Sequence, residues 1–270
     1  MKISYQGVPG AYSYITALNV AKIMKDKKAE LVPHKNFTEV WKSVNAESIA
    51  VIPIENSRAG SIHDNLYNFM RYKYKIIGEI HTEINHALLS KENDIKKIKK
   101  VYSHWQALSQ CHNFLKKHSI EGIEYFDTAG AAEFVMQSDE EGIAAIASEE
   151  AGKLYKLNII QPNIQDQKGN STRFLIIADK ENTLSYPKPS NKVAILFQAR
   201  SIPASLYKCL GAFATNNVNL TKIESIPLFE DPFMYVFWLE FEGRIADEPV
   251  RKSLNELAFF TKKVQILGEY

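Results

Sequence analysis

The chain has 270 residues, of which 45% are hydrophobic and 24% are charged, and its net charge at pH 7 is +2. This length suits one large domain or two smaller ones, and it allows a substantial core without structural disulfides or metals. The small net charge offers no basic field for nucleic acid or a membrane surface. The two cysteines, Cys111 and Cys209, form no Cys-x-x-Cys pair, which excludes a disulfide framework and a thiolate zinc site.

The N-terminal sequence MKISYQGVPGAYS lacks the apolar stretch of a signal peptide. Nowhere does the sequence contain about 18 consecutive apolar residues, the length that a membrane-spanning helix needs. We therefore expect a soluble, cytoplasmic protein.

The first 180 residues alternate short apolar runs with segments of helical periodicity. The predicted strands are Ile3–Gln6, Glu30–Val32, Ile49–Ile54, Lys99–Tyr102, Ile123–Phe126, Gly142–Ala147 and Arg173–Ala178. Helices are predicted at Ser61–Tyr72 and Trp105–Lys117. In the second helix, Leu108, Cys111 and Leu115 share one face. Strands separated by helices indicate parallel sheets built from β–α–β units.

Residues Ile76–Leu88 alternate between apolar and polar side chains, which predicts one long strand. A long strand midway through an α/β chain often crosses between lobes, so we expect a two-lobed domain over residues 1–180. One lobe would hold residues 1–77 and 160–180, and the other would hold residues 78–159.

A change of composition at Asp179–Asn191, with two prolines, two serines and few apolar residues, predicts a linker over residues 181–191. Residues 192–270 then form a second domain. Its predicted elements are a strand (Val193–Ala199), a helix (Ala204–Thr215), a strand (Asn219–Ser225), a turn (Glu230–Pro232), a strand (Phe233–Glu242), a helix (Asp247–Phe260) and a strand (Lys263–Leu267). The order β–α–β–β–α–β is that of a ferredoxin-like α+β sandwich.

Polar residues follow several of the predicted strands. The segments are Gly7–Ser13, Glu55–Ser61, Ser103–Gln106, Asp127–Ala129 and Asn170–Phe174. Ligands of α/β sheets bind beyond the carboxyl ends of the strands, so these segments predict one site with donors for a small anion. The sequence has no dinucleotide fingerprint, P-loop or His-Glu-x-x-His motif, and we expect neither a metal nor a cofactor.

Each segment also has a purely structural interpretation. Ser13 and Asp127 can each cap a helix, and His104 can simply begin one. Arg173 opens an apolar strand, where its charge needs a partner, and it can belong to a structural ion pair. His86 alternates with apolar neighbours and is predicted to be a core histidine, as both cysteines are predicted to be core residues.

Five of these motifs, in the same order, resemble the prephenate dehydratase family. They are Gly7-x-x-Gly10-Ala-Tyr-Ser13, PIENSRAGSI at Pro53–Ile62, SHWQALSQC at Ser103–Cys111, DTAGAA at Asp127–Ala132 and NSTRF at Asn170–Phe174. In the second part, NLTKIESIP at Asn219–Pro227 is similar to the regulatory ACT-domain motif of that family.

The resemblance implies an α/β fold in which a bilobal, type II periplasmic-binding-protein-like catalytic domain precedes a ferredoxin-like ACT domain. It implies a lyase of L-phenylalanine biosynthesis that converts prephenate to phenylpyruvate, water and carbon dioxide without a cofactor. It also implies feedback regulation by phenylalanine and a homodimer or homotetramer, with no nucleic-acid or membrane partner. The alternative interpretation is a non-catalytic sensor of small anions with an ACT output domain.

The resemblance assigns catalysis to Thr172, and chemistry adds Glu55 and His104 as groups that can stand behind it in proton transfer. Arg173 is suited to clamp a substrate carboxylate. The expected substrate-binding residues are Arg173, Asn170, Phe174, Asn56, Ser57, Ser13, Gln106 and Thr128.

The expected phenylalanine-binding residues lie in the second domain. They are Ala204, Ser205, Leu206, Asn219, Leu220, Glu224, Ser225 and Ile226. The sequence departs from the family pattern at four places. The first motif has Ala11, Tyr12 and Tyr14 where Thr, Phe and Glu are typical, and Trp105 replaces a proline. Ala204-Ser205-Leu206 stands where Gly-Ala-Leu is typical, and Ile226 replaces an arginine. The loss of an arginine near a bound amino acid is expected to weaken either its binding or its coupling to catalysis.

Overall fold

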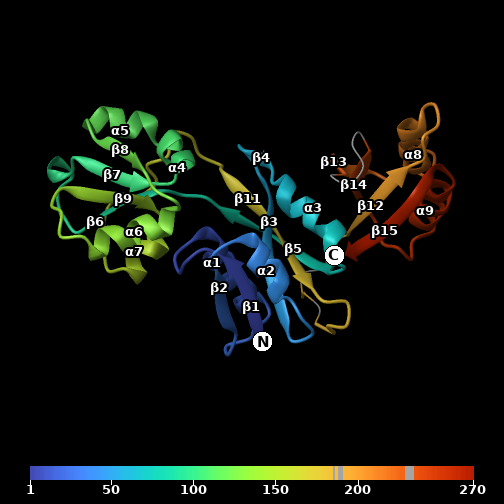
Figure 1. Cartoon of the computed structure of the whole chain (residues 1–270), viewed down its shortest axis with the longest axis horizontal. Helices are drawn as coiled ribbons and strands as arrows, with labels where there is room; N and C mark the ends of the chain where they lie inside the picture. The colour runs from blue at the N-terminus through green and yellow to red at the C-terminus, as the bar shows by residue number, and fades with distance from the viewer. Residues whose placement is uncertain (185, 188–190, 229–233) are drawn as a thin grey trace. The chain divides into compact units, whose positions relative to one another are not determined.

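The computed structural model describes residues 1–184, 186–187, 191–228 and 234–270 (Figure 1). Its first sheet has the order β2-β1-β3-β11-β5, with the short β4 paired to β3. The strands are β1 (Lys2–Gln6), β2 (Glu30–His34), β3 (Ser48–Asn56), β4 (Gly60–Ser61), β5 (Lys75–Glu83) and β11 (Ser171–Ala178). The helices of this part are α1 (Tyr12–Ile23), α2 (Phe37–Ser43) and α3 (His63–Arg71).

The second sheet has the order β10-β6-β9-β7-β8. Its strands are β6 (Ala87–Ser90), β7 (Lys100–Ser103), β8 (Glu121–Glu124), β9 (Ile143–Ala147) and β10 (Asn158–Gln161). Its helices are α4 (Trp105–Gln110), α5 (His112–His118), α6 (Thr128–Gln137) and α7 (Glu149–Leu154).

Every residue of β6 and β9 is buried, and this explains why helices cover both faces of this second sheet. Leu89 and Ala145 pack in one apolar cluster with residues of α6 and α7, whereas Leu88 and Ala144 pack in another with residues of α4 and α5. Successive side chains of a strand point to opposite faces, so a strand that is apolar throughout needs cover on both. Figure 1 shows α5 and α6 on opposite sides of the sheet.

The two sheets repeat one topology. In the first sheet β1, β2, β3 and β5 follow in sequence, and the later strand β11 is inserted between β3 and β5. In the second sheet β7, β8, β9 and β10 follow in sequence, and the earlier strand β6 is inserted between β9 and β10. This is the arrangement of a type II periplasmic-binding-protein-like domain, so the predicted fold class is confirmed.

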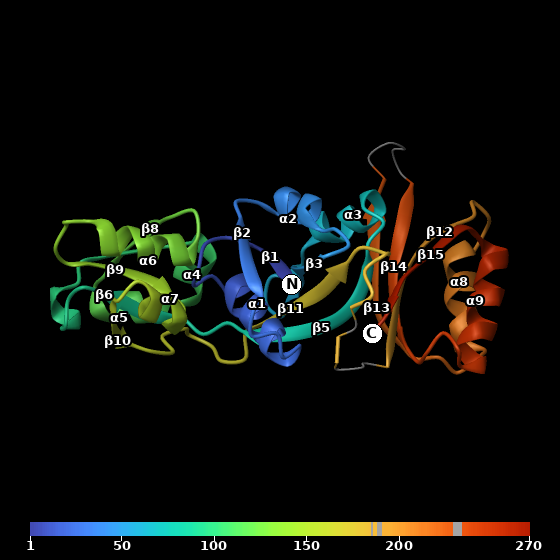
Figure 2. The ribbon, with the colours of Figure 1, turned by 90° about the horizontal axis from the view of Figure 1, so that it is seen from below.

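The C-terminal residues form the predicted ferredoxin-like sandwich, with an antiparallel sheet of order β13-β14-β12-β15. Its elements are β12 (Lys192–Ala199), α8 (Ser205–Ala214), β13 (Leu220–Pro227), β14 (Tyr235–Glu242), α9 (Glu248–Phe260) and β15 (Thr261–Glu269). Figure 2 shows α8 and α9 side by side on one face of this sheet. Ile195 and Leu239 point into the core beneath these helices.

Some predicted boundaries are wrong. The single strand expected over Ile76–Leu88 is two strands, because β5 ends at Glu83 and β6 begins at Ala87 in the other sheet. The helix expected over Trp105–Lys117 breaks at Cys111, and the strand expected at Ile123–Phe126 starts two residues earlier, as β8. β6 pairs antiparallel with β9 and β10, so the second sheet is mixed rather than parallel.

Parts of the predicted linker and of the turn at Glu230–Pro232 lie outside the described residues. Cys111 and Cys209 are both buried free thiols, as expected. None of the helices in the described ranges is long and apolar enough to cross a membrane.

Packing divides the chain into two compact units. The first comprises residues 1–43, 50–61 and 80–174, and the second comprises residues 44–49, 62–79 and 175–270. Helix α3 therefore packs in the same unit as the C-terminal sandwich. The ring of Phe69 in α3 meets that of Trp238 in β14 edge-on at 5.0 Å.

The loop before α1 is held against α7 inside the first unit. Gly10 has φ +91°, and a Cβ there would lie 2.9 Å from the Cα and Cβ of Ala151. The Gly10 carbonyl accepts a hydrogen bond from Ser148 Oγ at 2.7 Å. Helix α1 begins at Tyr12 after an N-cap at Ala11, so the expected capping role of Ser13 is wrong.

We expect Gly10→Ala to lower the free energy of unfolding by about 2–3 kcal/mol, because it adds a steric clash to the strain of a positive φ. Gly60→Ala is the matched control, since Gly60 has φ +81° and nothing within 4 Å of an added Cβ. The control should lose only about 1 kcal/mol. Urea unfolding of both variants measures the difference, and equal losses would contradict the close approach of Gly10 to α7.

Candidate active site

The side-chain amide of Asn56 lies at the centre of a polar network where β3 ends. Its Oδ1 accepts hydrogen bonds from the backbone N–H groups of Arg58 and Ala59, each at 3.0 Å. The oxygen of the amide is thereby fixed, so Nδ2 must point the other way. Nδ2 donates to Asn170 Oδ1 and to Thr172 Oγ1, both at 2.9 Å.

Thr172 is held by this amide as an acceptor. Its side chain is 9% exposed, at the start of β11. Because Oγ1 accepts from Asn56, the hydroxyl hydrogen is directed elsewhere and can be donated to a ligand. The neighbouring backbone is fixed by Ser57, whose N–H donates to the Ser171 carbonyl at 2.9 Å and whose Oγ accepts from the Ser171 N–H at 3.0 Å.

The network continues through residues that the sequence analysis did not place in the site. Asn170 Nδ2 donates to Gln110 Oε1 at 3.0 Å. The same oxygen lies 3.0 Å from His86 Nε2, and His86 Nδ1 lies 3.0 Å from the Tyr12 hydroxyl. Hydrogen bonds thus connect Tyr12 with Thr172 across the first unit.

The fixed orientation of Asn56 determines the direction of the whole chain of hydrogen bonds. Gln110 Oε1 already accepts from Asn170, so the proton of His86 is assigned to Nε2 and donated to Gln110. His86 Nδ1 is then an acceptor. The Tyr12 hydroxyl oxygen lies 2.6 Å from the Asn85 carbonyl oxygen and 3.0 Å from Nδ1, so its one proton is divided between these two acceptors.

His86 is 3% exposed, and burial lowers its pKa to about 4, opposed by the hydrogen bond to Gln110. The ring is therefore neutral at pH 7. The expectation of a core histidine with satisfied ring nitrogens is confirmed.

A second polar group lies where β7 and β8 end. His104 is the N-cap of α4, and its Nδ1 accepts from the Gln106 N–H at 3.3 Å. Asp127 caps α6 at the Gly130 N–H, immediately before Thr128. Burial raises the pKa of Asp127, while the capping N–H groups and the nearby His104 lower it. The structural interpretations of His104 and Asp127 are thus both realised, and they leave the side chain of Thr128 at the first turn of α6.

The remaining expected site residues occupy different settings. Glu55 is half-buried opposite Ser61 in the β3–β4 hairpin. Phe174 is 2% exposed and belongs to the core, and Arg173 is 8% exposed. Thr172 and Arg173 are consecutive in β11, so their side chains point to opposite faces of the sheet. Ser13 is buried in the first turn of α1, as its 8% exposure shows.

A cavity of about 190 Å³ lies beside the network and includes Gln110 in its wall. It is also lined by Arg58, Ser109, Asp166 and Gln167. The Arg58 guanidinium donates to the Lys168 carbonyl at 2.7 Å and brings a cation to the cavity. The motif at Pro53–Ile62 contained this arginine, and the sequence analysis did not select it.

The expected regulatory residues lie in the C-terminal sandwich. Ala204 has φ +57° before α8, and Leu206 and Leu220 pack against the core under the helices. Glu224 forms an ion pair with Lys222 at 3.3 Å. Three further positions complete the set: Asn219, whose carbonyl accepts from the Glu242 N–H, Ser205 at the start of α8, and Ser225 exposed in β13. Ile226 is 1% exposed, so this departure from the family pattern is part of the apolar packing.

The fold and this network define an α/β protein with two sheets of one topology, a polar site where strand ends and helix ends meet the segments that connect the sheets, and a C-terminal ferredoxin-like sandwich. The prephenate dehydratase family model matches residues 3–182. The chain therefore belongs to the prephenate dehydratase family.

Similar curated proteins cover the whole chain. Arogenate dehydratase/prephenate dehydratase 2 of Arabidopsis thaliana is 37% identical over 100% of this chain and 72% of its own length. The bifunctional chorismate mutase/prephenate dehydratase of Aquifex aeolicus is 36% identical over 100% of this chain and 73% of its own length.

Solved structures have the same fold. Prephenate dehydratase from Staphylococcus aureus has a TM-score of 0.84 at 31% identity, with 100% of both chains covered. A structure titled GqqA, a quorum quenching acylase, has a TM-score of 0.85 at 31% identity and covers 99% of this chain and 97% of its own. Prephenate dehydratase of Arthrobacter aurescens in complex with L-Phe has a TM-score of 0.87 at 24% identity and covers 99% of this chain and 89% of its own.

We expect the buried neutral His86 to make the protein less stable in acid. Below the unfolded pKa of about 6.5, the unfolded chain binds a proton that the native ring does not bind until about pH 4. The free energy of unfolding should therefore fall by roughly 3 kcal/mol between pH 6.5 and 4 from this group.

Urea unfolding at several pH values, for the wild type and for His86→Gln, isolates this contribution. The variant should have a shallower loss of stability between pH 6.5 and 4. His112→Gln is the control, because His112 is exposed at the start of α5, and it should keep the wild-type slope. A His86→Gln slope equal to that of the wild type would contradict the buried neutral assignment.

Proposed function

We propose that this chain converts prephenate to phenylpyruvate, water and carbon dioxide, the lyase reaction for which its family is named. The observation that carries the proposal is the orientation of Thr172 by Asn56, which leaves the hydroxyl hydrogen of Thr172 available to donate to a ligand. Family membership supports the reaction, and the residue roles below are our own proposal.

The chemistry requires a proton at the departing hydroxyl of prephenate. The ring carboxylate leaves as carbon dioxide, its electron pair enters the ring, and the C4 hydroxyl leaves as water once it is protonated. We assign the donor position to Thr172, polarised by the hydrogen bond from Asn56. Glu55 and His104 are the groups proposed to supply the proton behind it. Aromatisation drives the step, so orientation and preorganised dipoles provide most of the acceleration.

Binding of the two substrate carboxylates needs donors on either side of the reacting ring. Arg173 is the proposed bidentate clamp for one carboxylate, approached at the start of β11 from the face opposite Thr172, and backbone N–H groups near Ser57 and Ser13 provide further donors. The other residues proposed to contact the substrate are Asn170, Phe174, Asn56, Gln106 and Thr128. The burial of Phe174 favours a role in shaping the pocket wall rather than in exposed contact.

Regulation by phenylalanine through the C-terminal sandwich is part of the proposal. A structure of the same fold from Arthrobacter aurescens is titled as a complex with L-Phe. We assign the amino acid to the region of residues 204–206, 219–220 and 224–226. The sheet edges at β13 and β15 suit pairing across a two-fold axis, which supports a homodimer or homotetramer. We also propose a cytoplasmic location for it.

The domain limits of the proposal are 1–180 for catalysis, 181–191 for the linker and 192–270 for regulation. A second candidate activity, hydrolysis of an acyl amide, comes from the structural similarity to GqqA at 31% identity. Among the described residues no Ser–His–carboxylate set is joined by hydrogen bonds, so we rank it below the dehydratase reaction.

The first experiment is to incubate purified protein with prephenate and to follow phenylpyruvate, with and without phenylalanine. We expect turnover that phenylalanine suppresses. Arogenate, the amino counterpart of prephenate, is the parallel substrate, and its conversion to phenylalanine would broaden the activity. An acyl amide is the third substrate to be tested. Prephenate that binds without turnover would overturn the dehydratase assignment in favour of the sensor.

We expect Thr172→Ala to lower kcat by about 100-fold or more, because it removes the proposed donor. Thr172→Ser retains a hydroxyl within reach of Asn56 and should stay within about tenfold of the wild type. Both variants should show wild-type urea unfolding to within about 1 kcal/mol. Near-wild-type turnover by folded Thr172→Ala would remove this residue from the mechanism.

A further inference from the structure

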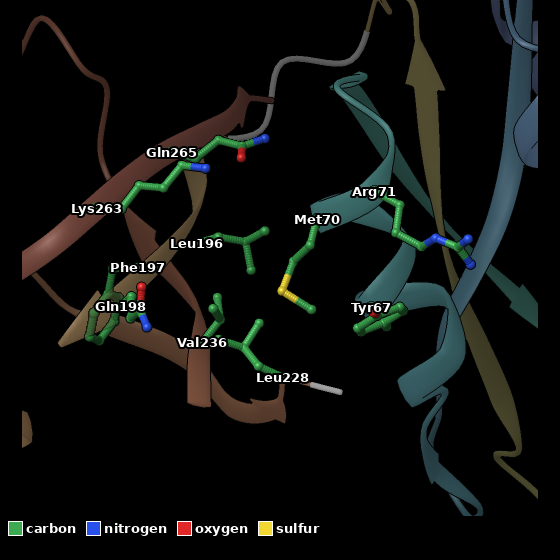
Figure 3. Close-up of a pocket in the computed structure, with 10 residues that line it drawn as sticks. All are labelled: Tyr67, Met70, Arg71, Leu196, Phe197, Gln198, Leu228, Val236, Lys263 and Gln265. Atoms are coloured by element: carbon green, nitrogen blue, oxygen red, sulfur yellow. The ribbon is translucent and has the colours of Figure 1, made fainter. Parts of the chain in front are cut away.

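A pocket of about 330 Å³ lies in the second packing unit, between α3 and the face of the C-terminal sheet opposite α8 and α9 (Figure 3). Its volume falls in the range of small-molecule sites. The lining residues are Tyr67, Met70, Arg71, Leu196, Phe197, Gln198, Leu228, Val236, Lys263 and Gln265. None of the residues assigned above to catalysis or to phenylalanine lines it.

The register of the sheet explains which side chains reach the pocket. Leu196 pairs with Trp238 and Gln265, and Gln198 pairs with Lys263, so these side chains share one face. Their neighbours in the strands, such as Ile195, point to the helices. α3 covers the Trp238 end of this face through Phe69, and the pocket is the part that α3 leaves open.

The pocket has an apolar floor and a polar rim. Figure 3 shows Met70 of α3 extending toward Leu196 and Val236 of the sheet. Lys263 and Gln265 extend from β15 above Leu196, whereas the Arg71 guanidinium points away from the sheet. Among the described lining residues there is no aspartate or glutamate.

We propose that this pocket binds a small aryl-alkyl carboxylate that carries no ammonium group. The ring would lie on Leu196 and Val236 against the thioether of Met70, a contact that sulfur makes readily with aromatic rings. The carboxylate would accept hydrogen bonds from Lys263 and the Gln265 amide at the rim. An amino acid is disfavoured, because its ammonium group would lie near the positively charged Lys263. The described lining residues include no aspartate or glutamate to pair with that ammonium.

Occupancy of this site would link the sheet to α3. One wall comes from α3, which follows the Asn56 turn and the short β4 in the chain, and the other wall comes from β12, β14 and β15. A ligand that contacts both walls stabilises the conformation in which α3 and the sheet are close enough for one molecule to touch both. The inference rests on binding alone and is independent of the proposed reaction.

The test uses the full chain and three probes: 3-phenylpropionate, the neutral 3-phenylpropanamide and L-phenylalanine. The readout is the methyl NMR signal of Met70, assigned by its loss in Met70→Leu. We expect 3-phenylpropionate to shift this signal in a saturable way. The amide should bind at least fivefold more weakly. L-phenylalanine, which we assign to residues 204–206, 219–220 and 224–226, should not displace 3-phenylpropionate from the pocket at equal concentration.

Lys263→Gln should weaken the binding of 3-phenylpropionate at least fivefold. Lys262→Gln is the matched control, because Lys262 precedes it in β15, is exposed and is not among the residues that line the pocket, and it should bind as the wild type does. An unshifted Met70 signal, equal affinity for acid and amide, or equal effects of the two lysine variants would each overturn the proposal. A prephenate assay run in parallel separates this result from that for the dehydratase reaction.

Discussion

The fixed amide of Asn56 is the interaction on which the rest of the proposed site depends. Two backbone N–H groups hold its oxygen, so its nitrogen has only one direction to face, toward Asn170 and Thr172. Every later hydrogen bond in the network follows from that direction. An aspartate at this position would still accept hydrogen bonds from the two backbone N–H groups. Its second oxygen would replace the N–H donor that faces Asn170 Oδ1 and Thr172 Oγ1, so the hydrogen bonds to those two oxygens would no longer be directed by this residue.

The network is stable in this place because the two connections between the sheets are bonded to each other. The Ile84 N–H donates to the Asn170 carbonyl, and the Ile164 N–H donates to the His86 carbonyl, each at 2.9 Å. The His86 N–H also donates to Gln165 Oε1 at 3.0 Å. A backbone segment that leaves a sheet must find other hydrogen-bond partners. Here each of the two segments that connect the sheets provides such partners for the other.

The sequence predicted the ferredoxin-like sandwich because its strands and helices are local patterns. It also selected Asn56 and, through the resemblance, Thr172 as candidate site residues, and the structure joins the two by a hydrogen bond. It missed Gln110 because its helix was expected to continue past Cys111, which makes Gln110 an interior position instead of a helix end. It did not place His86 in the site because the alternation of apolar and polar residues in Ile76–Leu88 continues through the segment that connects β5 to β6. The pocket beside α3 could not be predicted, since it depends on Phe69 meeting Trp238 from a distant strand.

The composition of the network limits what it can contribute to catalysis. Asn56, Asn170, Gln110 and Thr172 carry no charge, and the lowered pKa of His86 keeps that ring neutral at pH 7. Such a network supplies oriented dipoles and one donated hydroxyl hydrogen, not a strong acid. That suits a reaction driven by aromatisation, in which the protein must align a hydroxyl and a carboxylate for departure in a site whose dipoles need not reorganise. In the proposed mechanism, the charges that bind the substrate come from outside the network, from cations such as Arg173 and Arg58. Orientation and anion binding are thereby separated onto different residues, so that each can change without disturbing the other.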